Sequence, residues 1–260
     1  MKIALCGFGR AGKQVLRLVT EEREMHDIPM IFCRDGSKKA GKSVSDIAPV
    51  KGMNVPIHEI GRADEIFQND RPDVLIDFSS KLATMQLLPV CAKHGVKMVV
   101  CTTNFTKKEL RQIEETASGT PGFALAYAPN ITLGVNVLML LCEQTAQCLP
   151  EFDYAITEKH HKRKADVSAT AKKLASSLEN TLGKPVQVNS IRAGGYVGLH
   201  EVLAVGEFER ITIIHESFSR QAFANGAVIA AMYLLNKEGY FEMKDIVAHH
   251  FGLVERKMEQ

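Results

Sequence analysis

The chain opens with Lys2-Ile-Ala-Leu-Cys-Gly-Phe-Gly-Arg-Ala-Gly12, and this stretch decides the fold of its first half. The four apolar residues after Lys2 predict a buried strand, and a G-x-G-x-x-G motif follows it directly. Gly7 permits a tight turn, Gly9 lets a pyrophosphate approach the backbone, and Gly12 lets the following helix pack on the strand. Glycines also form turns that bind nothing, but the strand–helix junction favours a dinucleotide-binding site.

The rest of the first half alternates short apolar runs with helix-like stretches. Near-continuous apolar strands separated by helices are typical of a parallel sheet covered on both faces. The sequence therefore predicts an α/β fold, a Rossmann-like doubly wound parallel sheet over residues 1–130. The expected strands are Lys2–Cys6, Met30–Cys33, Val74–Asp77, Lys97–Cys101 and Gly122–Tyr127, and the expected helices are Gly12–Met25, Lys81–Lys93 and Glu109–Thr116.

The pattern changes after Asn130, where strands with period-two character follow one another through short connections. This predicts an α+β domain with a mixed or antiparallel sheet over residues 131–235, with the tail 236–260 returning to the first domain. The last long helix, Phe223–Leu235, could return with it. The other expected elements are the strands Tyr154–Lys159, Val186–Arg192, Tyr196–Gly206 and Ile211–Glu216 and the helices Val135–Cys148 and Ala169–Leu182.

The composition is ordinary for a soluble globular protein, with 45% apolar and 24% charged residues. The 32 basic residues nearly balance the 30 acidic ones, so the charge of +2 does not indicate a nucleic acid or a membrane as partner. The longest apolar stretches, such as Val135–Cys142, are too short to span a bilayer, and the start lacks a signal-peptide pattern. The six cysteines show no metal-ligand or disulfide spacing. We expect a cytoplasmic protein with reduced thiols, no metal and a small-molecule substrate.

The end of the second predicted strand bears on which dinucleotide binds. An NAD site usually places Asp or Glu about 20 residues after the last glycine, against the ribose 2′-hydroxyl. Here Cys33 and Arg34 take that place, and a guanidinium can pair with a 2′-phosphate through two parallel hydrogen bonds. Asp35 keeps NADH open as a cofactor, and a solvated basic loop is the alternative interpretation. The sequence predicts a preference for NADPH.

The most unusual stretch, residues 158–170, reads E-K-H-H-K-R-K-A-D-V-S-A-T and runs from a predicted strand into a helix start. The hydroxyls of Ser168 and Thr170 stand beside unpaired helix-start amides, an arrangement suited to a carboxylate. The cations would hold a second carboxylate, and a histidine can supply a proton near neutral pH. A solvated loop before a capped helix is the usual explanation of such a charge run, but the adjacent His160 and His161 favour a substrate site. No thiol or carboxylate cluster supports a metal there.

Two polar turns, Asp77-Phe-Ser-Ser80 and Cys101-Thr-Thr-Asn104, follow predicted parallel strands at the ends where α/β proteins bind ligands. Either is also consistent with ordinary loop chemistry. Ser79 lacks the G-x-S-x-G context of a hydrolase nucleophile. His249 and His250 are expected at the surface or in packing.

Together these motifs resemble the dihydrodipicolinate reductase (4-hydroxy-tetrahydrodipicolinate reductase) family over essentially the whole chain. The double-histidine block is specific to that family, whereas the glycine loop is not. The stretches that carry the resemblance are Gly7–Gly12, Arg34, Asp77–Ser80, Ala128–Asn130, Gly134–Asn136, Glu158–His161, Lys164, Asp166, Arg192–Gly194, Gly198–His200, Ser219–Arg220, Phe223 and Gly226–Ala227.

The resemblance implies that NAD(P)H delivers hydride to C4 of a cyclic unsaturated imine in diaminopimelate and lysine biosynthesis. It implies that His160 is the general acid and Lys164 a second proton donor or substrate clamp, in a homotetramer joined through the second-domain sheets. It assigns the dicarboxylate substrate to His161, Ser168, Ala169 and Thr170. It assigns the cofactor to Gly7, Phe8, Gly9, Arg10, Ala11, Gly12, Arg34, Cys101, Thr102, Thr103, Ala128, Pro129, Asn130 and Ile131.

The sequence departs from the family pattern at two turns. Where the family pattern reads K-x-D-A-P-S-G-T-A, Lys164–Ala171 reads K-A-D-V-S-A-T-A. This chain is thus one residue shorter there, lacks the proline and has Ala169 in place of a glycine. The G-T-T-G turn has Cys101 and Asn104 at its glycine positions, and Tyr196 stands where an acid is expected. The alternatives are therefore a same-fold reductase of another cyclic imine or amino-acid-derived substrate, and a dinucleotide-binding paralogue without catalysis.

Overall fold

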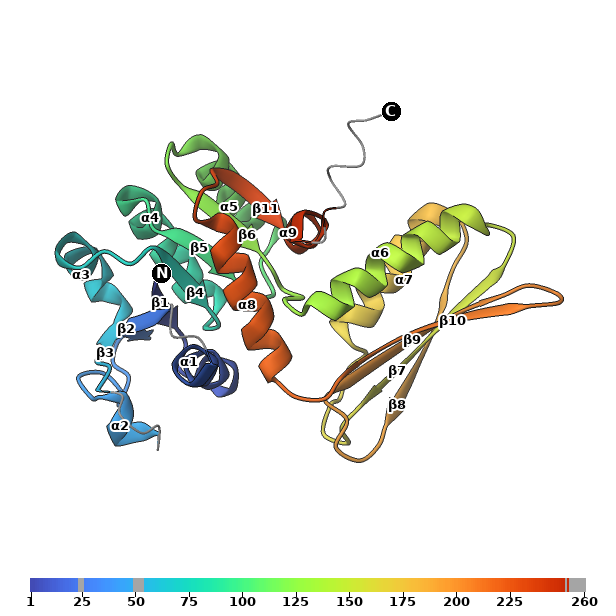
Figure 1. The fold of residues 1–260 in the computed structure, drawn as a ribbon, viewed down its shortest axis with the longest axis horizontal. Helices are drawn as coiled ribbons and strands as arrows, with labels where there is room; N and C mark the ends of the chain where they lie inside the picture. The colour runs from blue at the N-terminus through green and yellow to red at the C-terminus, as the bar shows by residue number, and fades with distance from the viewer. Residues whose placement is uncertain (23–25, 49–53, 251, 253–260) are drawn as a thin grey trace. The chain divides into compact units, whose positions relative to one another are not determined.

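The computed structural model describes residues 1–22, 26–48, 54–250 and 252, and the chain divides into two compact units (Figure 1). The first unit comprises Met1–Ile131 and the stretch from Phe223 onward, and the second comprises Thr132–Ala222. Each unit is built around its own sheet, with helices packed against it.

The sheet of the first unit is parallel throughout, in the order β11-β6-β5-β4-β1-β2-β3. β1 is flanked by β4, with Ile3 opposite Val74, and by β2, with Ala4 opposite Met30. All four residues of β4 are buried, as expected for a parallel strand covered on both faces. The strands are β1 Lys2–Cys6, β2 Asp27–Cys33, β3 Ile57–Glu59, β4 Val74–Asp77, β5 Lys97–Val100, β6 Ala124–Tyr127 and β11 Gly239–Glu242.

The helices of the first unit begin and end at residues suited to those positions. Ser80 caps α4 by accepting a hydrogen bond from the Ala83 amide, and Gly95 ends that helix in the left-handed region. Thr106 and Glu109 form a capping box at the start of α5. The helices are α1 Arg10–Glu22, α2 Val44–Ile47, α3 Ala63–Asn69 with a preceding 3₁₀ turn at Ile60–Arg62, α4 Lys81–His94, α5 Lys107–Gly119, α8 Gln221–Leu234 and α9 Met243–His250.

The sheet of the second unit is mixed, in the order β10-β9-β7-β8. β7 pairs antiparallel with β9 and parallel with β8, and α7 connects the two parallel strands. Tyr154 and Ile156 of β7 pack with Leu138 and Leu174 from the two helices in one apolar core. The elements are α6 Leu133–Cys148, β7 Asp153–His160, α7 Ala169–Leu182, β8 Gln187–Arg192, β9 Gly198–Val205 and β10 Arg210–Ser217.

The predicted fold class, a parallel α/β sheet and a mixed-sheet α+β domain, is confirmed. Each predicted strand and helix overlaps an observed one, although Arg23–Met25, the expected end of the first helix, lie outside the described residues. The predictions missed α2, β3, α3, β11 and α9, which are short or weakly patterned. The stretch from Phe223 onward, whose helix the sequence allowed to return to the first domain, groups with the first unit.

A tight backbone contact explains the placement of α8. A Cβ at Gly226 would lie 2.0 Å from the carbonyl oxygen of Ile131, so only glycine permits this approach of helix and chain. Seven residues of α8 are buried, and most of them are alanine or glycine. A helix with such small buried residues packs closely, which a reading of apolar periodicity alone does not reveal.

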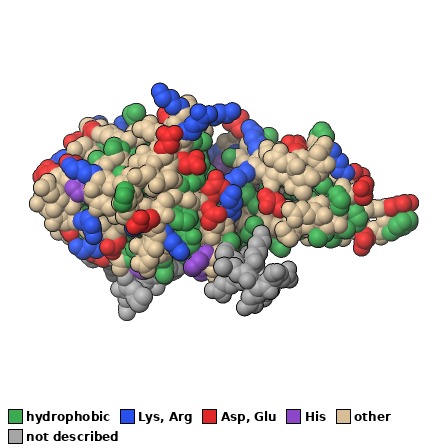
Figure 2. Space-filling view, turned by 90° about the horizontal axis from the view of Figure 1, so that it is seen from above, with side chains coloured by type: hydrophobic (Ala, Val, Ile, Leu, Met, Phe, Trp, Pro, Cys, Tyr) green, Lys and Arg blue, Asp and Glu red, His purple; other side chains and the backbone are tan. Residues whose placement is uncertain are grey.

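The distribution of charges, thiols and apolar helices can be compared with what the composition predicts. Figure 2 shows basic and acidic side chains interspersed over the face it presents. Cys6, Cys33, Cys91 and Cys142 are buried free thiols. Helices in the described ranges fall short of the length and hydropathy that a bilayer span requires.

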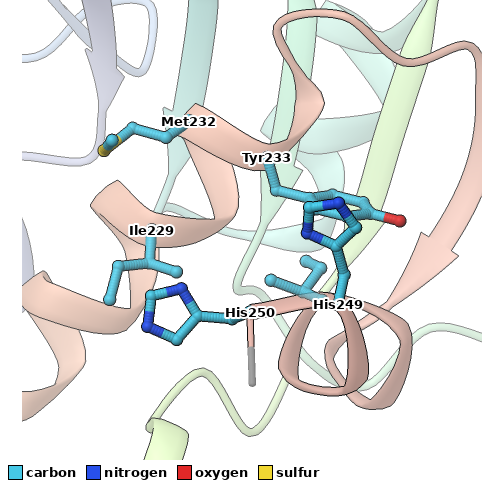
Figure 3. Close-up of a pocket in the computed structure, with 6 residues that line it drawn as sticks. Ile229, Met232, Tyr233, His249 and His250 are labelled. Carbon is cyan, nitrogen blue, oxygen red and sulfur yellow. The ribbon is translucent and has the colours of Figure 1, made fainter. Parts of the chain in front are cut away.

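The paired histidines at the end of α9 lie at the surface beside a small apolar cavity of about 220 Å³ (Figure 3). The ring of His249 packs against Tyr233, with centroids 5.1 Å apart. This agrees with the expectation of surface position and packing. The cavity is lined by Ile229, Met232, Tyr233, Ile246, His249 and His250.

Candidate active site

The glycine loop presents an open backbone surface where β1 meets α1. Gly7 has a φ of +92°, and a Cβ there would lie 2.7 Å from the backbone of Phe78. A Cβ at Gly12 would lie 2.1 Å from the carbonyl oxygen of Gly7. Both Gly7 and Gly12 are therefore required by the folded chain, whether or not a ligand is bound. Gly9 differs, because a Cβ there meets nothing within 4 Å. Open space above a backbone at a helix start fits the close approach of a pyrophosphate.

Asp77 connects the two polar turns that follow β4 and β5. Its buried carboxylate accepts hydrogen bonds from the amide of Ser79 (2.8 Å) and the hydroxyl of Thr84 (2.5 Å). The Thr84 hydroxyl is also bonded to that of Thr102 (2.8 Å). Burial raises the pKa of Asp77, and the hydrogen bonds from Ser79 and Thr84 oppose that rise. The turns line a cavity of about 490 Å³, formed by Phe78, Ser79, Ser80, Lys81, Cys101, Thr102, Thr103 and Asn104.

The altered turn after β5 keeps the backbone shape that glycine usually supplies. Asn104 has a φ of +68°, in the left-handed region that asparagine tolerates better than most residues. Cys101 replaces the other glycine and lines the cavity. Burial and the nearby charge of Asp77 raise the pKa of Cys101, so this side chain stays a neutral thiol. Both departures are therefore compatible with the geometry of the turn.

Ala128–Ile131 follows β6 at the same edge of the sheet, because the carboxyl ends of parallel strands lie together. The Ala128 amide donates to the carbonyl of Val100 (2.8 Å), which holds this segment beside the turn after β5. Ala128 and Ile131 are buried, whereas Pro129 and Asn130 are half-buried. The structure thus brings the glycine loop and both later segments of the predicted cofactor site to one edge.

After β2, the carboxylate of Asp35 is hydrogen-bonded within the protein, whereas the side chain of Arg34 is exposed. Asp35 accepts hydrogen bonds from the Gly61 amide (2.8 Å) and the Gln86 side chain (3.3 Å). Arg34 is exposed, and its guanidinium has no hydrogen-bond partner in the part of the chain that the structure describes. Lys39 reaches back to the glycine loop, where its ammonium donates to the carbonyl of Phe8 (3.0 Å). Lys39 is therefore held against the glycine loop, while Arg34 remains exposed after β2.

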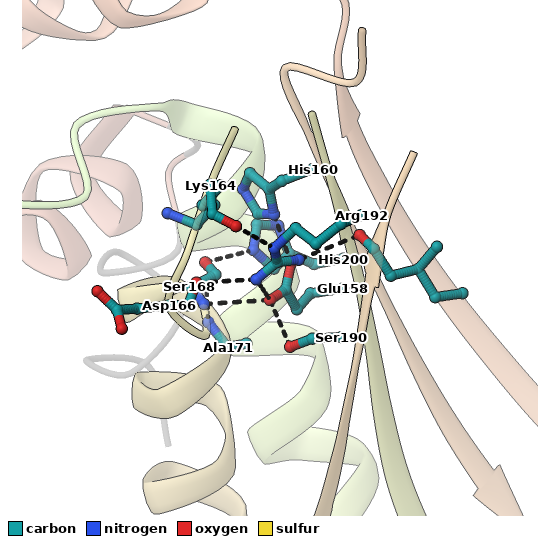
Figure 4. A network of polar contacts seen from close by, with 10 residues as sticks. Glu158, His160, Lys164, Asp166, Ser168, Ala171, Ser190, Arg192 and His200 are labelled. Atoms are coloured by element: carbon teal, nitrogen blue, oxygen red, sulfur yellow. Dashed lines mark hydrogen bonds and ion pairs between the residues drawn. The ribbon is translucent and has the colours of Figure 1, made fainter. Parts of the chain in front are cut away.

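The second unit carries a polar cluster centred on Glu158 of β7 (Figure 4). Its side chain is fully buried and accepts hydrogen bonds from Arg192 through two nitrogens, Nη1 to Oε2 (2.9 Å) and Nη2 to Oε1 (2.6 Å). The Ser190 hydroxyl (2.6 Å) and the Ser168 amide (3.2 Å) donate to Oε1, and His160 Nδ1 donates to Oε2. Burial opposes ionisation, but these hydrogen bonds outweigh it and hold the pKa of Glu158 at about 2. Glu158 is therefore a carboxylate at every physiological pH.

The carboxylate determines which nitrogen of His160 is available for chemistry. Because an ionised carboxylate only accepts, Nδ1 carries a proton and Nε2 is the nitrogen that can exchange one. A Cβ at Gly198 would lie 3.1 Å from Nε2, so the absence of a side chain there keeps the nitrogen accessible. Burial lowers the pKa of His160, Glu158 raises it, and Lys164 and Arg192 lower it further.

At the helix start Ser168–Thr170, the hydroxyl of Ser168 is already hydrogen-bonded within the protein. The Ser168 hydroxyl is buried, accepts from the Ala171 amide (3.4 Å) and is hydrogen-bonded to Nε2 of His200 (2.9 Å). Ala169 is exposed as the first residue of α7, and its φ is not positive. The alanine is therefore not strained where the family has glycine. Burial, with smaller contributions from the charges of His160 and His215, lowers the pKa of His200 to about 4, so this imidazole is neutral.

The loop between β7 and α7 carries the remaining predicted residues. The Lys164 carbonyl accepts from Arg192 Nε (2.8 Å), while its ammonium points away from Glu158 (Figure 4). The His161 amide donates to the carbonyl of Tyr196 (3.0 Å). Among the described residues, Nδ1 of His161 has no hydrogen-bond partner although it is buried. The structure thus brings His160, His161, Lys164 and Ser168–Thr170 into one region of the second unit.

Glu158, Ser190, Arg192 and His200 belong to the site although the sequence pattern predicts no role for them. A signal for the first was present, because residues two apart on a strand point to the same face and Glu158 stands two before His160. Ser190 and Arg192 have the same spacing on β8. Their register opposite Glu158 and His160 follows from strand pairing, which the sequence does not show.

Comparison with known families accounts for nearly the whole chain. Residues 1–131 match the family described as dihydrodipicolinate reductase, N-terminus, and residues 134–247 match dihydrodipicolinate reductase, C-terminus. The chain belongs to the dihydrodipicolinate reductase family. This confirms the resemblance that the double-histidine block indicated, and members of this family are NAD(P)H-dependent oxidoreductases.

Individual relatives support membership over the full length. The chain is 34% identical over 266 residues to the 4-hydroxy-tetrahydrodipicolinate reductase of Methanopyrus kandleri, covering 94% of this chain and 95% of that protein. It is 36% identical over 214 residues to that of Thermosipho africanus, covering 82% and 95%. The fold matches a dipicolinate-bound dihydrodipicolinate reductase from Paenisporosarcina sp. TG-14, with a TM-score of 0.79 and 22% identity over 93% of this chain and 97% of that one.

Proposed function

We propose that this protein reduces 4-hydroxy-tetrahydrodipicolinate to tetrahydrodipicolinate with NAD(P)H, in the diaminopimelate and lysine pathway. The observation that carries this proposal is full-length membership of a reductase family, with His160 and Lys164 at the positions that the family pattern predicts. The reaction removes one water from the substrate and adds one hydride and one proton to the remaining conjugated ring.

The residues of the first unit suit a dinucleotide. The open backbone at Gly9 and the start of α1 would take the pyrophosphate, and the cavity beside Ser79 and Thr103 would take the nicotinamide end. When bound, the reduced nicotinamide supplies the hydride. Asp77 holds the turn that lines this cavity through its bond to the Ser79 amide.

The residues of the second unit suit a dianionic ring. Lys164 supplies a cation, and the exposed start of α7 at Ala169 supplies the positive end of a helix dipole. His161 and Thr170 stand on the same loop and helix start. The solved relative that is described as dipicolinate-bound supports a pyridine dicarboxylate as the ligand class. Because Ser168 already bonds His200, we assign its hydroxyl to orientation and the adjacent amides to carboxylate binding.

His160 is proposed as the general acid, acting through Nε2. In the protein alone, burial keeps its pKa low, so the ring is mostly neutral at physiological pH. Two carboxylates bound beside it would favour the imidazolium, because opposite charges stabilise the ionised form. The substrate itself would then raise the fraction of His160 that can donate a proton to the ring.

An assay of NADPH oxidation with enzymatically generated 4-hydroxy-tetrahydrodipicolinate tests the proposal. We expect absorbance at the NADPH wavelength to fall only when this substrate is present. No oxidation at high enzyme concentration would favour the same-fold reductase of another cyclic imine, since the loop of Lys164–Ala171 is shorter than the family pattern. Tight NADPH binding without any turnover would favour the non-catalytic paralogue.

Arg34→Ala is expected to raise the KM for NADPH about tenfold or more and to leave the KM for NADH within about twofold. The reason is that Arg34 is exposed and unpaired among the described residues, while Asp35 is held by Gly61 and Gln86. Steady-state kinetics with both cofactors measure the effect. Wild-type efficiency with NADH that equals or exceeds that with NADPH would contradict the proposed preference.

We also propose a homotetramer formed through the sheet of the second unit. The face of this sheet away from α6 and α7 carries Ile191, Val205 and Ile214, which are 43%, 39% and 57% exposed. Light scattering should give four times the 28.7 kDa of one chain, and Ile214→Asp should reduce that mass. A wild-type monomer at micromolar concentration would contradict this assembly.

A further inference from the structure

We propose that the ion pair between the buried Glu158 and the half-buried Arg192 is the positioning element of the active site. It orients His160 directly and holds the Lys164–Ser168 loop through its backbone. The catalytic part of this proposal rests on the proposed reductase activity, whereas the structural part does not. Neither residue is expected to touch the substrate.

The carboxylate of Glu158 is saturated with hydrogen bonds. Oε1 accepts from Arg192, Ser190 and the Ser168 amide, and Oε2 accepts from Arg192 and His160. With five donors aimed at two oxygens in a fully buried side chain, the carboxylate cannot rotate without breaking several bonds. The position of His160 Nδ1 is therefore determined by a fixed acceptor.

Arg192 also binds groups beyond the carboxylate of Glu158. Its Nε donates to the Lys164 carbonyl and its Nη2 to the Asp166 carbonyl, both at 2.8 Å. The guanidinium thus binds the Glu158 carboxylate through Nη1 and Nη2 and the loop backbone through Nε and Nη2. Since Glu158 also accepts from the Ser168 amide, both ends of the 164–168 segment depend on the same ion pair.

Stability alone does not account for such a pair. Burying the Glu158 carboxylate and most of the Arg192 side chain removes charge from water, and that cost offsets much of the attraction between them. The pair instead fixes the orientation of the groups around it, since its donors and acceptors have defined partners. Three predicted site residues, His160, Lys164 and Ser168, are held by it.

The charges around His160 determine how removal of the Glu158 carboxylate would change the pKa of His160 and the pH dependence of kcat. From its own strand Glu158 favours the imidazolium, while Lys164 of the loop and Arg192 of β8 oppose it, and His200 of β9 packs against the ring with centroids 5.4 Å apart. Removing the Glu158 charge leaves only the opposing cations, so the pKa of His160 would fall further. A general acid works in its protonated form, so the decline of kcat with rising pH would move to lower pH.

Glu158→Gln tests the orientation of His160. Three donors converge on the Oε1 position, so the amide oxygen should occupy it and the amide NH2 should face His160. That forces Nδ1 to accept, and two-bond 1H–15N spectra of the free protein should change from the Nδ1–H to the Nε2–H tautomer. We expect kcat to fall about 100-fold, the alkaline limb of kcat to move to lower pH, and the Kd for NADPH to stay within about twofold.

Glu143→Gln is the matched control, because Glu143 is a partly buried carboxylate of the same unit whose side chain accepts a hydrogen bond from Ser177 of α7 rather than from the 164–168 segment. It should leave the His160 tautomer and the pH profile unchanged. If Glu158→Gln does not fold, Glu158→Asp keeps the charge but withdraws the carboxylate by about 1.5 Å. We expect about a tenfold loss of kcat and a mixture of tautomers.

The outcomes separate the two proposals. A folded Glu158→Gln or Glu158→Asp variant in which His160 keeps the Nδ1–H tautomer, with a wild-type pH profile, would overturn the positioning role. If no variant or wild-type protein reduces the substrate, the proposed function fails, while the tautomer measurement still decides the positioning role. Arg192→Lys tests the loop: we expect the tautomer to stay and the KM for the dicarboxylate to rise about tenfold, and an unchanged KM would overturn that part.

Discussion

His160→Ala is expected to lower kcat about 1000-fold while the Kd for NADPH stays within about twofold. A positioned general acid contributes about 10²–10⁴-fold to a rate, and the alanine removes the whole proton donor. The residue lies in the second unit, whereas the glycine loop, Arg34 and the cavity beside Ser79 lie in the first. Stopped-flow turnover and fluorescence titration with NADPH measure the two quantities separately.

The control for this variant is His249→Ala, which removes a surface histidine that packs on Tyr233 in the first unit. It should leave both kcat and the Kd for NADPH unchanged. The variant also has to keep the secondary structure of the wild type, because His160 is buried against His200. A large loss of NADPH affinity in His160→Ala, or turnover near that of the wild type, would show that the histidine does not act as proposed.

Gly9→Ala is expected to weaken NADPH binding at least about 30-fold without changing the melting temperature. In the protein alone a Cβ at residue 9 meets nothing within 4 Å, so the folded chain tolerates the methyl group. A pyrophosphate that lies against this backbone does not, because its oxygens need that space. Calorimetric titration with NADPH and thermal melts of the free protein measure the two effects.

Gly12→Ala provides the contrasting variant. A Cβ at residue 12 would lie 2.1 Å from the carbonyl oxygen of Gly7, so the strand–helix junction must shift and the free protein should melt at a lower temperature. We expect a loss of about 2–3 kcal/mol, comparable with other overpacked sites. The opposite pattern, a destabilised Gly9→Ala or an unaffected Gly12→Ala, would contradict the roles assigned to the two glycines.

Local sequence patterns were sufficient for the strands and helices that bury long apolar runs. The residues Lys2–Cys6 and Val74–Asp77 were expected as strands with the bounds that the structure shows, and the helix Ala169–Leu182 was likewise expected between Ser168 and Gly183. Elements with few apolar residues were not predicted, such as α2 at Val44–Ile47 and β3 at Ile57–Glu59. Their conformations depend on neighbours that are distant in the sequence, for example the pairing of β3 with β2.

The sequence by itself determined the chemistry that this protein can offer: a glycine loop for a dinucleotide, and histidines with lysines on one short segment before a helix. Residue type and spacing along one strand or loop carry that information, because neighbours in the chain stay neighbours in space. Only the tertiary structure decided the orientation of those groups. The acceptor for His160, the clamp on the Lys164 carbonyl and the partner of Ser168 come from Glu158, Arg192 and His200, and strand pairing and loop closure bring most of these partners from far along the chain.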